Sequence, residues 1–311
     1  MQILVTGANG FVGSALCEFL ESAGHRVRRA VRQSTSNLEH AVGDIGPETR
    51  WGALLERSDA VVHLAARVHQ LGDSGTESAA QYRRVNVLGT LNLAKQAAAA
   101  GVGRFVYLSS IKVNGDATEA GRSFSCFDAP SPNDPYGVSK MEAEWGVRDI
   151  SGQAGMEFVI VRPPLVYGPG VRANFLTMMR MLWRGMPLPL GRVTQNRRSL
   201  IGVDNLNDLL ATCLGHPRAA NRIFLASDGE DLSTAGLLRR LGDALERPAW
   251  LVPVPIPVLE WGARALGRGD LARRLLGSLQ VDISETREVL GWNPPVSVDE
   301  GLRRTVRGFL R

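Results

Sequence analysis

The sequence predicts an α/β fold in which a doubly wound parallel sheet is followed by a smaller C-terminal α/β lobe. Over residues 1–165, short runs rich in β-branched residues alternate with longer helical segments, as is typical of strand–helix–strand units. A glycine-rich stretch, TGANGFVG at 6–13, lies between the first run and the first helical segment. After residue 165 the alternation becomes irregular and prolines cluster near 187–189 and 248–257. We therefore expect one lobe over 1–165 and a second mainly over 166–311.

The predicted elements follow in order along the first lobe. We expect strands at 2–6, 26–31, 40–43, 59–64, 104–109 and 157–162, and helices at 11–23, 50–57, 80–100 and 136–153. Further on, RSLIGV followed by DNLNDLLATCL predicts a strand and a helix, so that the chain returns to the first lobe near 198–226. The last predicted helix covers 299–310.

Composition narrows the classes of function. The chain has 311 residues and a net charge of +5, but its basic residues are scattered, which argues against a nucleic-acid partner. The longest apolar candidate, WLVPVPIPVLEW, contains three prolines, so we expect no membrane insertion. The three cysteines lack metal-type spacing, so we expect no metal and a cytoplasmic location. Scattered arginines instead suit a small anionic ligand such as a diphosphate.

The glycine-rich stretch predicts a dinucleotide-binding loop of the Rossmann type. Gly7 permits a tight turn, Gly10 lets the backbone approach a pyrophosphate, and Gly13 allows the helix to pack closely on the strand. The N-terminus of the following helix then faces the anion.

The end of the second predicted strand carries information about the cofactor. An NAD-binding protein usually has an acidic residue here, whereas this chain has HRVRRAVRQ at 25–33, with Arg26, Arg28, Arg29 and Arg32. A guanidinium can bind a 2′-phosphate through two charge-assisted hydrogen bonds, so Arg32 favours NADP(H) and leaves NAD(H) possible. The alternative interpretation is that these arginines are solvated strand-end residues.

Tyr136 and Lys140 form a candidate acid–base pair. They lie four residues apart on a predicted helix and therefore on one face of it. An ammonium one turn away favours the phenolate, so we expect Lys140 to lower the pKa of Tyr136. Ser109 and Ser110 end the preceding predicted strand, where the carboxyl edge of a parallel sheet presents a ligand crevice.

These motifs, taken in order, resemble the extended short-chain dehydrogenases/reductases of the NAD-dependent epimerase/dehydratase family that act on nucleotide sugars. The resemblance runs from end to end, through TGANGFVG, GDI, HLAA, VNVLGT, SSIKVNG, YGVSK, RPPLVYGPG and RRSLIGVDNLNDL. It implies that Ser110 is the catalytic hydroxyl, that Tyr136 is the acid/base, and that Lys140 tunes Tyr136 and holds the nicotinamide ribose.

The resemblance also implies two sets of binding residues. The cofactor-binding set is Gly7, Asn9, Gly10, Phe11, Val12, Gly13, Arg32, Asp44, Ile45, Leu64, Ala65, Ala66, Asn86, Tyr136, Lys140 and Pro163. The set for a UDP-sugar substrate is Ser110, Lys112, Asn174, Leu190 and Arg198. Within the second set, Arg198 matches an arginine that clamps the diphosphate, and Leu190 lies in the segment that holds the uracil. His63 is expected in the strand core. His69 lies beyond HLAAR, where family members approach the sugar, and contact of His69 with the sugar is the less favoured alternative.

Departures from the family pattern narrow the activity. Ile111 and Lys112 stand where 4,6-dehydratases carry Asp-Glu, so dehydration is disfavoured. The first expectation is an NAD(P)H-dependent 4-ketoreductase of a UDP-4-keto-6-deoxy-N-acetylhexosamine, similar to O-antigen enzymes that form UDP-N-acetylquinovosamine. The alternative is a UDP-N-acetylglucosamine or UDP-glucose 4-epimerase with bound NAD. A reductase of a hydrophobic ketone and a non-catalytic NADP sensor fit the residues less well.

We also expect a homodimer. In the resembling family, the helices that correspond to 80–100 and 136–153 pair with their mates across a twofold axis. Val87, Leu91 and Ala98 form an apolar stripe on the first of these helices that could serve such a contact.

Overall fold

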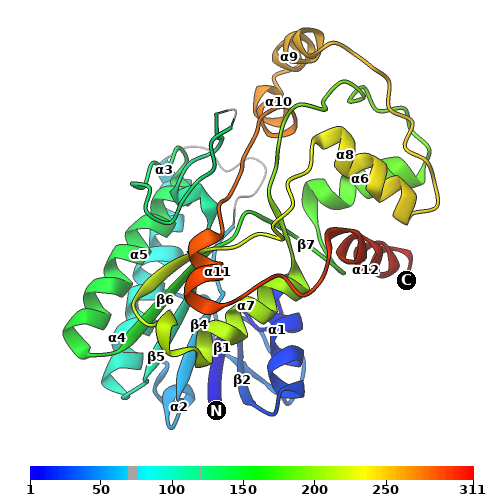
Figure 1. Cartoon of the computed structure of the whole chain (residues 1–311). Coiled ribbons are helices and arrows are strands. Elements are labelled where there is room, and N and C mark those ends of the chain that lie inside the picture. Colours follow the sequence, from blue (N-terminus) through cyan, green and yellow to red (C-terminus); the bar gives the residue numbers. More distant parts are fainter. Residues whose placement is uncertain (69–75, 120) are drawn as a thin grey trace.

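A parallel sheet forms the centre of the first lobe. The computed structural model describes residues 1–68, 76–119 and 121–311. Within them, the strand order of the main sheet is β3-β2-β1-β4-β5-β6-β9, and every neighbouring pair is parallel. The strands are β1 (Gln2–Thr6), β2 (Arg26–Val31), β3 (Glu39–Ala41), β4 (Ala60–His63), β5 (Arg104–Leu108), β6 (Glu157–Arg162) and β9 (Arg222–Leu225). The predicted α/β fold is confirmed (Figure 1).

Helices cover both faces of this sheet because its strands are apolar on both sides. Ile3 and Val5 of β1 pack with Leu16 of helix α1 and Leu206 of helix α7, while Leu4 belongs to the cluster on the opposite face. A strand that is buried on both faces has a continuous run of apolar residues. The run ILV in β1, just before the glycine-rich loop, has this cause. The covering helices are α1 (Phe11–Ser22) and α7 (Val203–Gly215) on one face, and α4 (Thr90–Ala99) and α5 (Pro135–Ala154) on the other.

The predicted helix 80–100 is three segments rather than one. They are α3 (Thr76–Tyr82), a π-helical segment η1 (Arg83–Gly89) and α4. The wider turn places the buried Asn86 amide against the backbone of Arg67, which donates to its Oδ1 at 2.8 Å and accepts from its Nδ2 at 3.0 Å. Gly89 lies against Ile45, and a Cβ there would be 2.7 Å from the Ile45 Cγ2 atom. Periodicity alone could not reveal this bulge, since its cause is a contact far along the chain.

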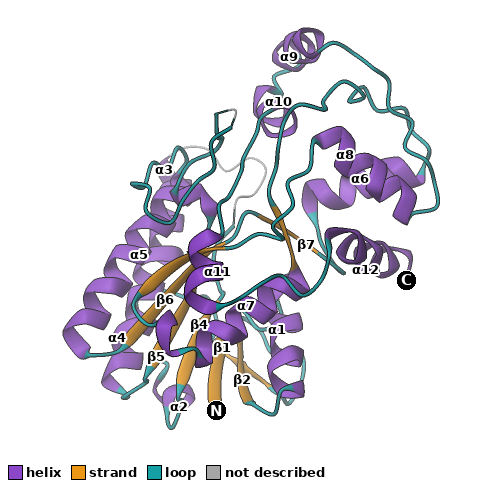
Figure 2. Cartoon of the chain, in the orientation of Figure 1, coloured by secondary structure: helices purple, strands orange, loops and turns teal. Residues whose placement is uncertain are grey.

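The second lobe has its own small sheet and core. Strands β7 (Leu165–Tyr167) and β8 (Leu200–Gly202) pair in parallel, and the core around them includes Phe175, Leu238 and Leu302. Its helices are α6 (Ala173–Trp183), α8 (Thr234–Ala244), α9 (Ile256–Ala265), α10 (Gly269–Leu276) and α12 (Val298–Leu310). Figure 2 shows these helices grouped away from the main sheet, with α9 at the far end.

Four short elements complete the chain. They are α2 (Gly52–Leu55), α11 (Ser284–Leu290), and the 3₁₀ turns η2 (Ile111–Val113) and η3 (Pro217–Ala219). Among the described residues, no helix combines the length and the apolar character that a membrane crossing requires.

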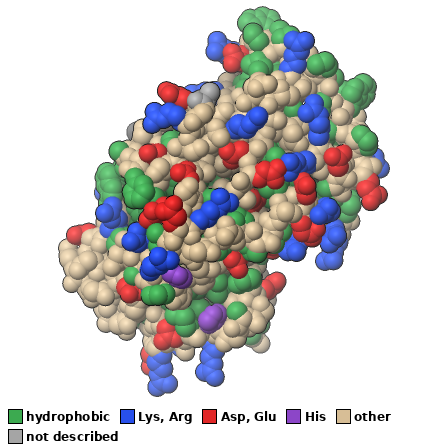
Figure 3. Space-filling view, viewed as in Figure 1, with side chains coloured by type: hydrophobic (Ala, Val, Ile, Leu, Met, Phe, Trp, Pro, Cys, Tyr) green, Lys and Arg blue, Asp and Glu red, His purple; other side chains and the backbone are tan. Residues whose placement is uncertain are grey.

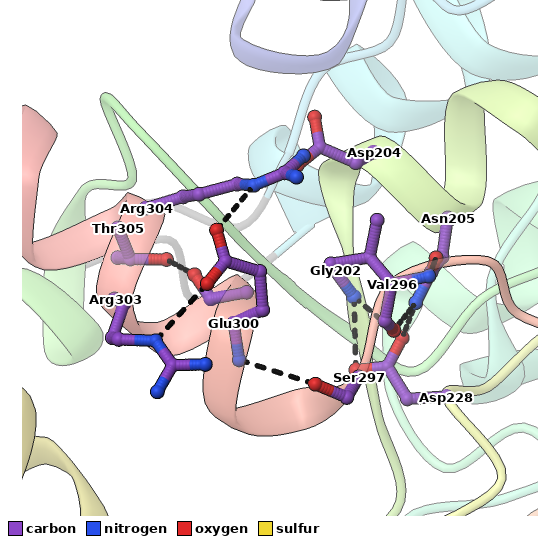
Figure 4. Close-up of polar contacts among 11 residues, drawn as sticks. Gly202, Asp204, Asn205, Asp228, Val296, Ser297, Glu300, Arg303, Arg304 and Thr305 are labelled. Carbon is purple, nitrogen blue, oxygen red and sulfur yellow. Dashed lines mark hydrogen bonds and ion pairs between the residues drawn. The ribbon is translucent and has the colours of Figure 1, made fainter.

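A half-buried carboxylate joins β8, α7 and the segment before α12. Asp228 accepts hydrogen bonds from the Asn205 side chain at 2.7 Å, from the Tyr167 hydroxyl at 2.7 Å and from the Gly202 backbone at 2.9 Å. Asn205 also binds both backbone polar groups of Val296, at 2.8 and 2.9 Å (Figure 4). Burial raises the pKa of Asp228, and these donors lower it in part. The C-terminal helix is thereby fixed to the loops above the main sheet.

The apolar stripe expected on 80–100 lies mostly inside the subunit. Val87 is buried, and Leu91 and Ala98 pack against the core beneath α4 and α5. The Leu91 side chain lies over Gly146 of α5, where a Cβ would be only 2.3 Å away. Part of the stripe therefore joins two helices of one chain, whereas Leu91 and Ala98 are only partly buried, and the dimer contact stays a prediction.

Candidate functional site

The candidate site lies at the carboxyl ends of the main strands. The strand order reverses between β1 and β4, and parallel sheets bind ligands in the crevice at such a point. The glycine-rich loop follows β1 and Leu64–Ala66 follows β4. Ser110 follows β5 and Pro163 follows β6. Four adjacent strands thus carry the glycine-rich loop, Leu64–Ala66, Ser110 and Pro163 to one edge of the sheet.

The glycine-rich loop has the geometry that a pyrophosphate requires. Gly7 has φ of +66°, and a Cβ there would lie 3.0 Å from the Ala65 backbone. A Cβ on Gly13 would lie 2.1 Å from the Gly7 carbonyl oxygen, so α1 could not approach β1 with any other residue. Gly10 precedes α1 with no side-chain cap, which leaves the first backbone N–H groups open to an anion. This cradle fits a dinucleotide.

The remaining cofactor candidates surround that loop. Asn9 is exposed, while Phe11 and Val12 begin α1 and are partly buried. The Ala65 backbone donates to the Thr6 hydroxyl at 3.2 Å, which fixes β4 against β1. Pro163 is buried, and its carbonyl accepts from Ile111 at 3.0 Å, behind the catalytic candidates.

The four arginines at β2 differ in their surroundings. Arg28 donates to the Leu54 and Glu56 carbonyls at 2.8 and 2.6 Å, and Arg29 pairs with Glu21 at 2.7 Å. Arg26 is exposed at the start of the strand. Arg32 lies beyond the end of β2, exposed, with its Nε 2.8 Å from Asp44 Oδ1. Arg28 and Arg29 are therefore structural, and Arg32 is the one near the expected ribose position.

Ser110, Tyr136 and Lys140 are brought together by β5 and α5. Tyr136 lies in the first turn of α5, and the Ser110 hydroxyl acts on its phenol, where it lowers the pKa against the effect of burial. Lys140 Nζ lies 6.0 Å from the Tyr136 ring centroid and 4.6 Å from that of Tyr107, and it donates to the Leu108 carbonyl at 2.9 Å. The spacing of four residues on one helix face accounts for this meeting.

The electrostatics of the free site differ from the expectation. Burial raises the pKa of Tyr136 to about 12, and the Ser110 hydroxyl only partly opposes this effect. Burial lowers the pKa of Lys140 to about 7, with Glu144 opposing it. In the free protein the pKa of Tyr136 is therefore raised and not lowered as expected, because burial is the largest effect on it.

The start of α5 is fixed by its own cap. Asp134 Oδ1 accepts from the Gly137 backbone at 2.6 Å, and Pro135 occupies the first turn, where its missing N–H costs nothing. A Cβ on Gly137 would lie 2.7 Å from the Lys112 carbonyl oxygen. Lys112, a predicted substrate residue, has its ammonium in ion pairs with Asp116 and, at 3.2 Å, with Asp134. Its charge therefore holds the η2 loop against the α5 cap beside Tyr136.

The other predicted substrate residues lie on the second lobe. Arg198 is half-buried beside β8 and donates to the Gly277 carbonyl at 3.2 Å. Asn174 is exposed in the first turn of α6, and Leu190 packs against the core of the second lobe. Burial lowers the pKa of Arg198, and the charge of Arg274 on α10 lowers it further. Two guanidinium groups near each other favour an anionic ligand between them.

Sequence reasoning missed Arg274 and the buried pair of Glu144 and Arg162. The feature of the sequence that could have pointed to Arg274 is the Arg-Arg pair at 273–274, three residues before Gly277. Glu144 lies one helical turn after Lys140, and Arg162 ends β6. Nothing in the sequence indicated that these two residues meet.

The histidines and acidic residues that the structure describes provide no metal site. His63 is fully buried between the hydroxyls of Thr6 at 2.7 Å and Thr90 at 2.9 Å, and burial lowers its pKa to about 3. It is thus a residue of the strand core, as expected. His69 lies outside the described residues. No group of three or more His, Cys, Asp or Glu among the described residues could hold a metal ion.

Comparison with known proteins agrees with this geometry. The NAD dependent epimerase/dehydratase family matches residues 3–226. A UDP-glucose 4-epimerase of Vibrio cholerae is 47% identical over 314 residues, covering 100% of this chain and 96% of that protein. A GDP-6-deoxy-D-mannose reductase of Pseudomonas aeruginosa is 28% identical over 316 residues, covering 97% and 95%.

A solved structure shares the fold. UDP-glucuronic acid 4-epimerase from Bacillus cereus, in complex with NAD, superposes with a TM-score of 0.80 over 100% of this chain and 99% of that one. Its sequence is 21% identical, so the likeness concerns the fold alone.

Proposed function

The chain belongs to the NAD dependent epimerase/dehydratase family, and on that premise we propose that it is a 4-epimerase of UDP-linked hexoses. The observation that carries the proposal is the 47% identity, over the full chain, to the Vibrio cholerae UDP-glucose 4-epimerase. Of the two activities expected from the sequence, this identity favours the epimerase over the 4-ketoreductase. The geometry around Ser110, Tyr136 and Lys140 supports either.

Tyr136 is the proposed acid/base. Epimerisation removes a hydride from C4 and a proton from the O4 hydroxyl. Both are returned after the 4-keto sugar has rotated, so that the hydride reaches the opposite face of C4. NAD(P), when bound, supplies the hydride acceptor. The Tyr136 phenolate takes the O4 proton and gives it back, and the Ser110 hydroxyl, which lowers the pKa of Tyr136, favours that phenolate. Because the pKa of Tyr136 is about 12 in the free protein, bound ligands must lower it before it can accept a proton at neutral pH.

Arg198 and Arg274 are the proposed diphosphate clamp. Burial lowers the pKa of Arg198 and the charge of Arg274 lowers it further, so an anion bound by both groups relieves a repulsion that the free protein bears. Asn174 and Leu190, on the same lobe, are proposed to contact the phosphates and the uracil. This assignment gives residues 166–311 the role of the substrate-binding lobe and residues 1–165, with 198–226, that of the dinucleotide-binding lobe.

A second candidate is the 4-ketoreductase of a UDP-4-keto-6-deoxy-N-acetylhexosamine. The exposed Arg32 favours it, since a guanidinium at this position suits NADPH, a dissociable reductant. The same Arg32 supports NADP(H) as the preferred cofactor of either enzyme, with NAD(H) as the alternative.

One experiment separates the two activities. The purified protein is incubated with UDP-galactose without added cofactor, and separately with NADPH and the UDP-4-keto sugar. An epimerase that retains NAD(P) forms UDP-glucose in the first reaction and consumes little NADPH in the second. A reductase leaves UDP-galactose unchanged in the first reaction and consumes NADPH in the second, and this result would overturn the proposal.

We propose a homodimer formed through the outer face of α5 and η1. Trp145 is 52% exposed on α5 and Leu88 is 36% exposed on η1, and large apolar residues in such positions favour an interface. Light scattering should give a dimer mass for the protein and a monomer mass for Trp145→Arg. A monomer mass for the unsubstituted protein would contradict this assembly.

The cytoplasm is the proposed compartment. Cys17, Cys126 and Cys213 are all free, and burial raises the pKa of Cys17 and of Cys213 to about 12. Free thiols persist in reducing compartments. Cell fractionation that recovers the protein from an oxidising compartment would contradict this location.

A further inference from the structure

The second lobe exposes large apolar side chains on and around α9. This helix has no buried residue. Trp261 is 74% exposed, and Leu266, just after the helix, is 75% exposed. Trp250 is 63% exposed in the loop that leads to α9, and Val258 is 53% exposed in its first turn. Large residues exposed to this extent in one region mark an interaction site.

Spacing places apolar and basic residues on neighbouring faces of α9. Val258, Trp261 and Ala265 are separated by three and four positions, so they lie along one face. Arg264 and Arg268 are exposed beside this face. We call Val258, Trp261, Arg264, Leu266 and Arg268 the α9 surface. Figure 3 shows hydrophobic and basic side chains together at the upper end of the molecule, over α9 and α10.

Positive charge is concentrated in this part of the chain. Residues 172–200 and 246–277 contain eleven arginines and three acidic residues, which gives them a net charge of +8, whereas the whole chain carries +5. The two segments adjoin each other. Leu188 donates to the Trp250 carbonyl at 2.9 Å, and Arg247 donates to the Trp183 carbonyl at 3.0 Å with its guanidinium 4.0 Å from the Trp183 ring centroid.

We propose that the α9 surface docks on an anionic membrane surface. Tryptophan and leucine beside arginine are the residues of helices that lie in the interfacial plane of a bilayer. A ten-residue helix is about 15 Å long, too short to cross the hydrocarbon core, so α9 lies along the surface. A second copy of the chain fits less well, because a twofold contact would bring two strongly positive regions together.

The position of the α9 surface links docking to the proposed diphosphate site. Helix α10 follows α9 in the chain, and hydrogen bonds hold the C-terminal end of α10 beside the proposed diphosphate site. Arg198 donates to the Gly277 carbonyl at 3.2 Å, and the Thr234 hydroxyl donates to the Leu275 carbonyl at 2.5 Å. A membrane contact at α9 would therefore hold this side of the site near the lipid headgroups. The docking itself does not depend on which reaction the site performs.

Vesicle binding tests the proposal directly. The full chain is sedimented with vesicles of phosphatidylcholine alone, or with about one third phosphatidylglycerol, at low and at physiological salt. We expect binding to the anionic vesicles and at least about tenfold weaker binding to the neutral ones. Trp261→Ser with Leu266→Ser, and separately Arg264→Gln with Arg268→Gln, should each weaken binding by about tenfold or more. These residues are exposed, so the variants should fold normally.

The matched control is Leu38→Ser, which removes an exposed apolar residue (70% exposed) from the first lobe and should leave binding unchanged. Equal binding of all variants, or no binding of the unsubstituted protein to anionic vesicles, would overturn the proposal. So would a change of mass by light scattering that follows the Trp261 and Leu266 substitutions, because the surface would then bind a second copy. Loss of binding would leave the proposed epimerase unaffected, since epimerisation of UDP-galactose is assayed without lipid.

Discussion

Arg162 on β6 and Glu144 on α5 form an ion pair whose side chains are only 3% and 2% exposed. The guanidinium makes two contacts with the carboxylate, at 2.5 and 2.9 Å, and a third with Asn114 Oδ1 at 2.9 Å. Glu144 also accepts from the Ser109 hydroxyl. Glu144 thus joins α5, which carries Lys140, both to β6 through Arg162 and to the end of β5 through Ser109, the neighbour of Ser110.

Removing either partner of this pair should destabilise the fold. Arg162→Met leaves a buried carboxylate without its partner, and breaking a buried pair in this way typically costs about 3–5 kcal/mol. Glu144→Gln should cost a similar amount, whereas the double variant Glu144→Met with Arg162→Met should cost less than the sum. Urea unfolding measures all three. Arg84→Gln is the control, since its pair with Glu48 is exposed and exposed pairs are worth about 0–1 kcal/mol. Strict additivity of the two single substitutions would contradict the coupling.

Lys140→Met should stabilise the free protein at low pH. Burial lowers the pKa of Lys140 from 10.5 to about 7, so between these values the unfolded chain holds a proton that the native state lacks. Stability therefore rises with pH across this window, and the cost of burying the ammonium is largest below pH 7. A tenfold change in proton affinity is worth about 1.4 kcal/mol, and the lost hydrogen bond to Leu108 costs about 1 kcal/mol. We expect the free energy of unfolding of Lys140→Met to exceed that of the unsubstituted protein by about 1–3 kcal/mol at pH 6, and by less at pH 9.

An independent measurement checks the cause. The chain has three lysines, Lys95, Lys112 and Lys140, so a protein labelled with ¹³C at lysine Cε gives three signals. The signal absent from Lys140→Met should titrate with a midpoint near pH 7 in the free protein. A midpoint near 10 would show that burial does not perturb Lys140.

Arg32 should control the choice between NADP(H) and NAD(H). It is exposed beyond β2, and its ion pair with Asp44 is also exposed, so a 2′-phosphate can compete for the guanidinium at little cost. Hydrogen bonds to charged groups are worth about 1.5–3 kcal/mol each, so Arg32→Asp should weaken NADP(H) by about tenfold or more and spare NAD(H). Arg26→Asp is the control on the same strand. Titration calorimetry that shows no preference in the unsubstituted protein would remove this role.

The main sheet could be predicted from the sequence, because each strand of the first lobe is a local apolar run and the glycines mark the first turn. It also placed Ser110, Tyr136 and Lys140 on elements that bring them together. It could not give the π-helical segment at Asn86, the electrostatic effect of Arg274 on Arg198, or the Glu144–Arg162 pair. Each of these depends on a partner far along the chain. The sign of the Tyr136 pKa was missed for the same reason, since burial is a property of the folded site.

The central claim is that Tyr136 moves the proton in C4 epimerisation of a UDP-hexose. The most direct test follows the anomeric ¹H NMR signals of UDP-galactose incubated with the protein and with Tyr136→Phe, at equal content of bound NAD(P). We predict that the unsubstituted protein forms UDP-glucose until equilibrium is reached, and that Tyr136→Phe turns over about 10²–10⁴-fold more slowly. Equal rates for the two proteins, or unchanged UDP-galactose with an unsubstituted protein that holds its cofactor, would contradict the claim.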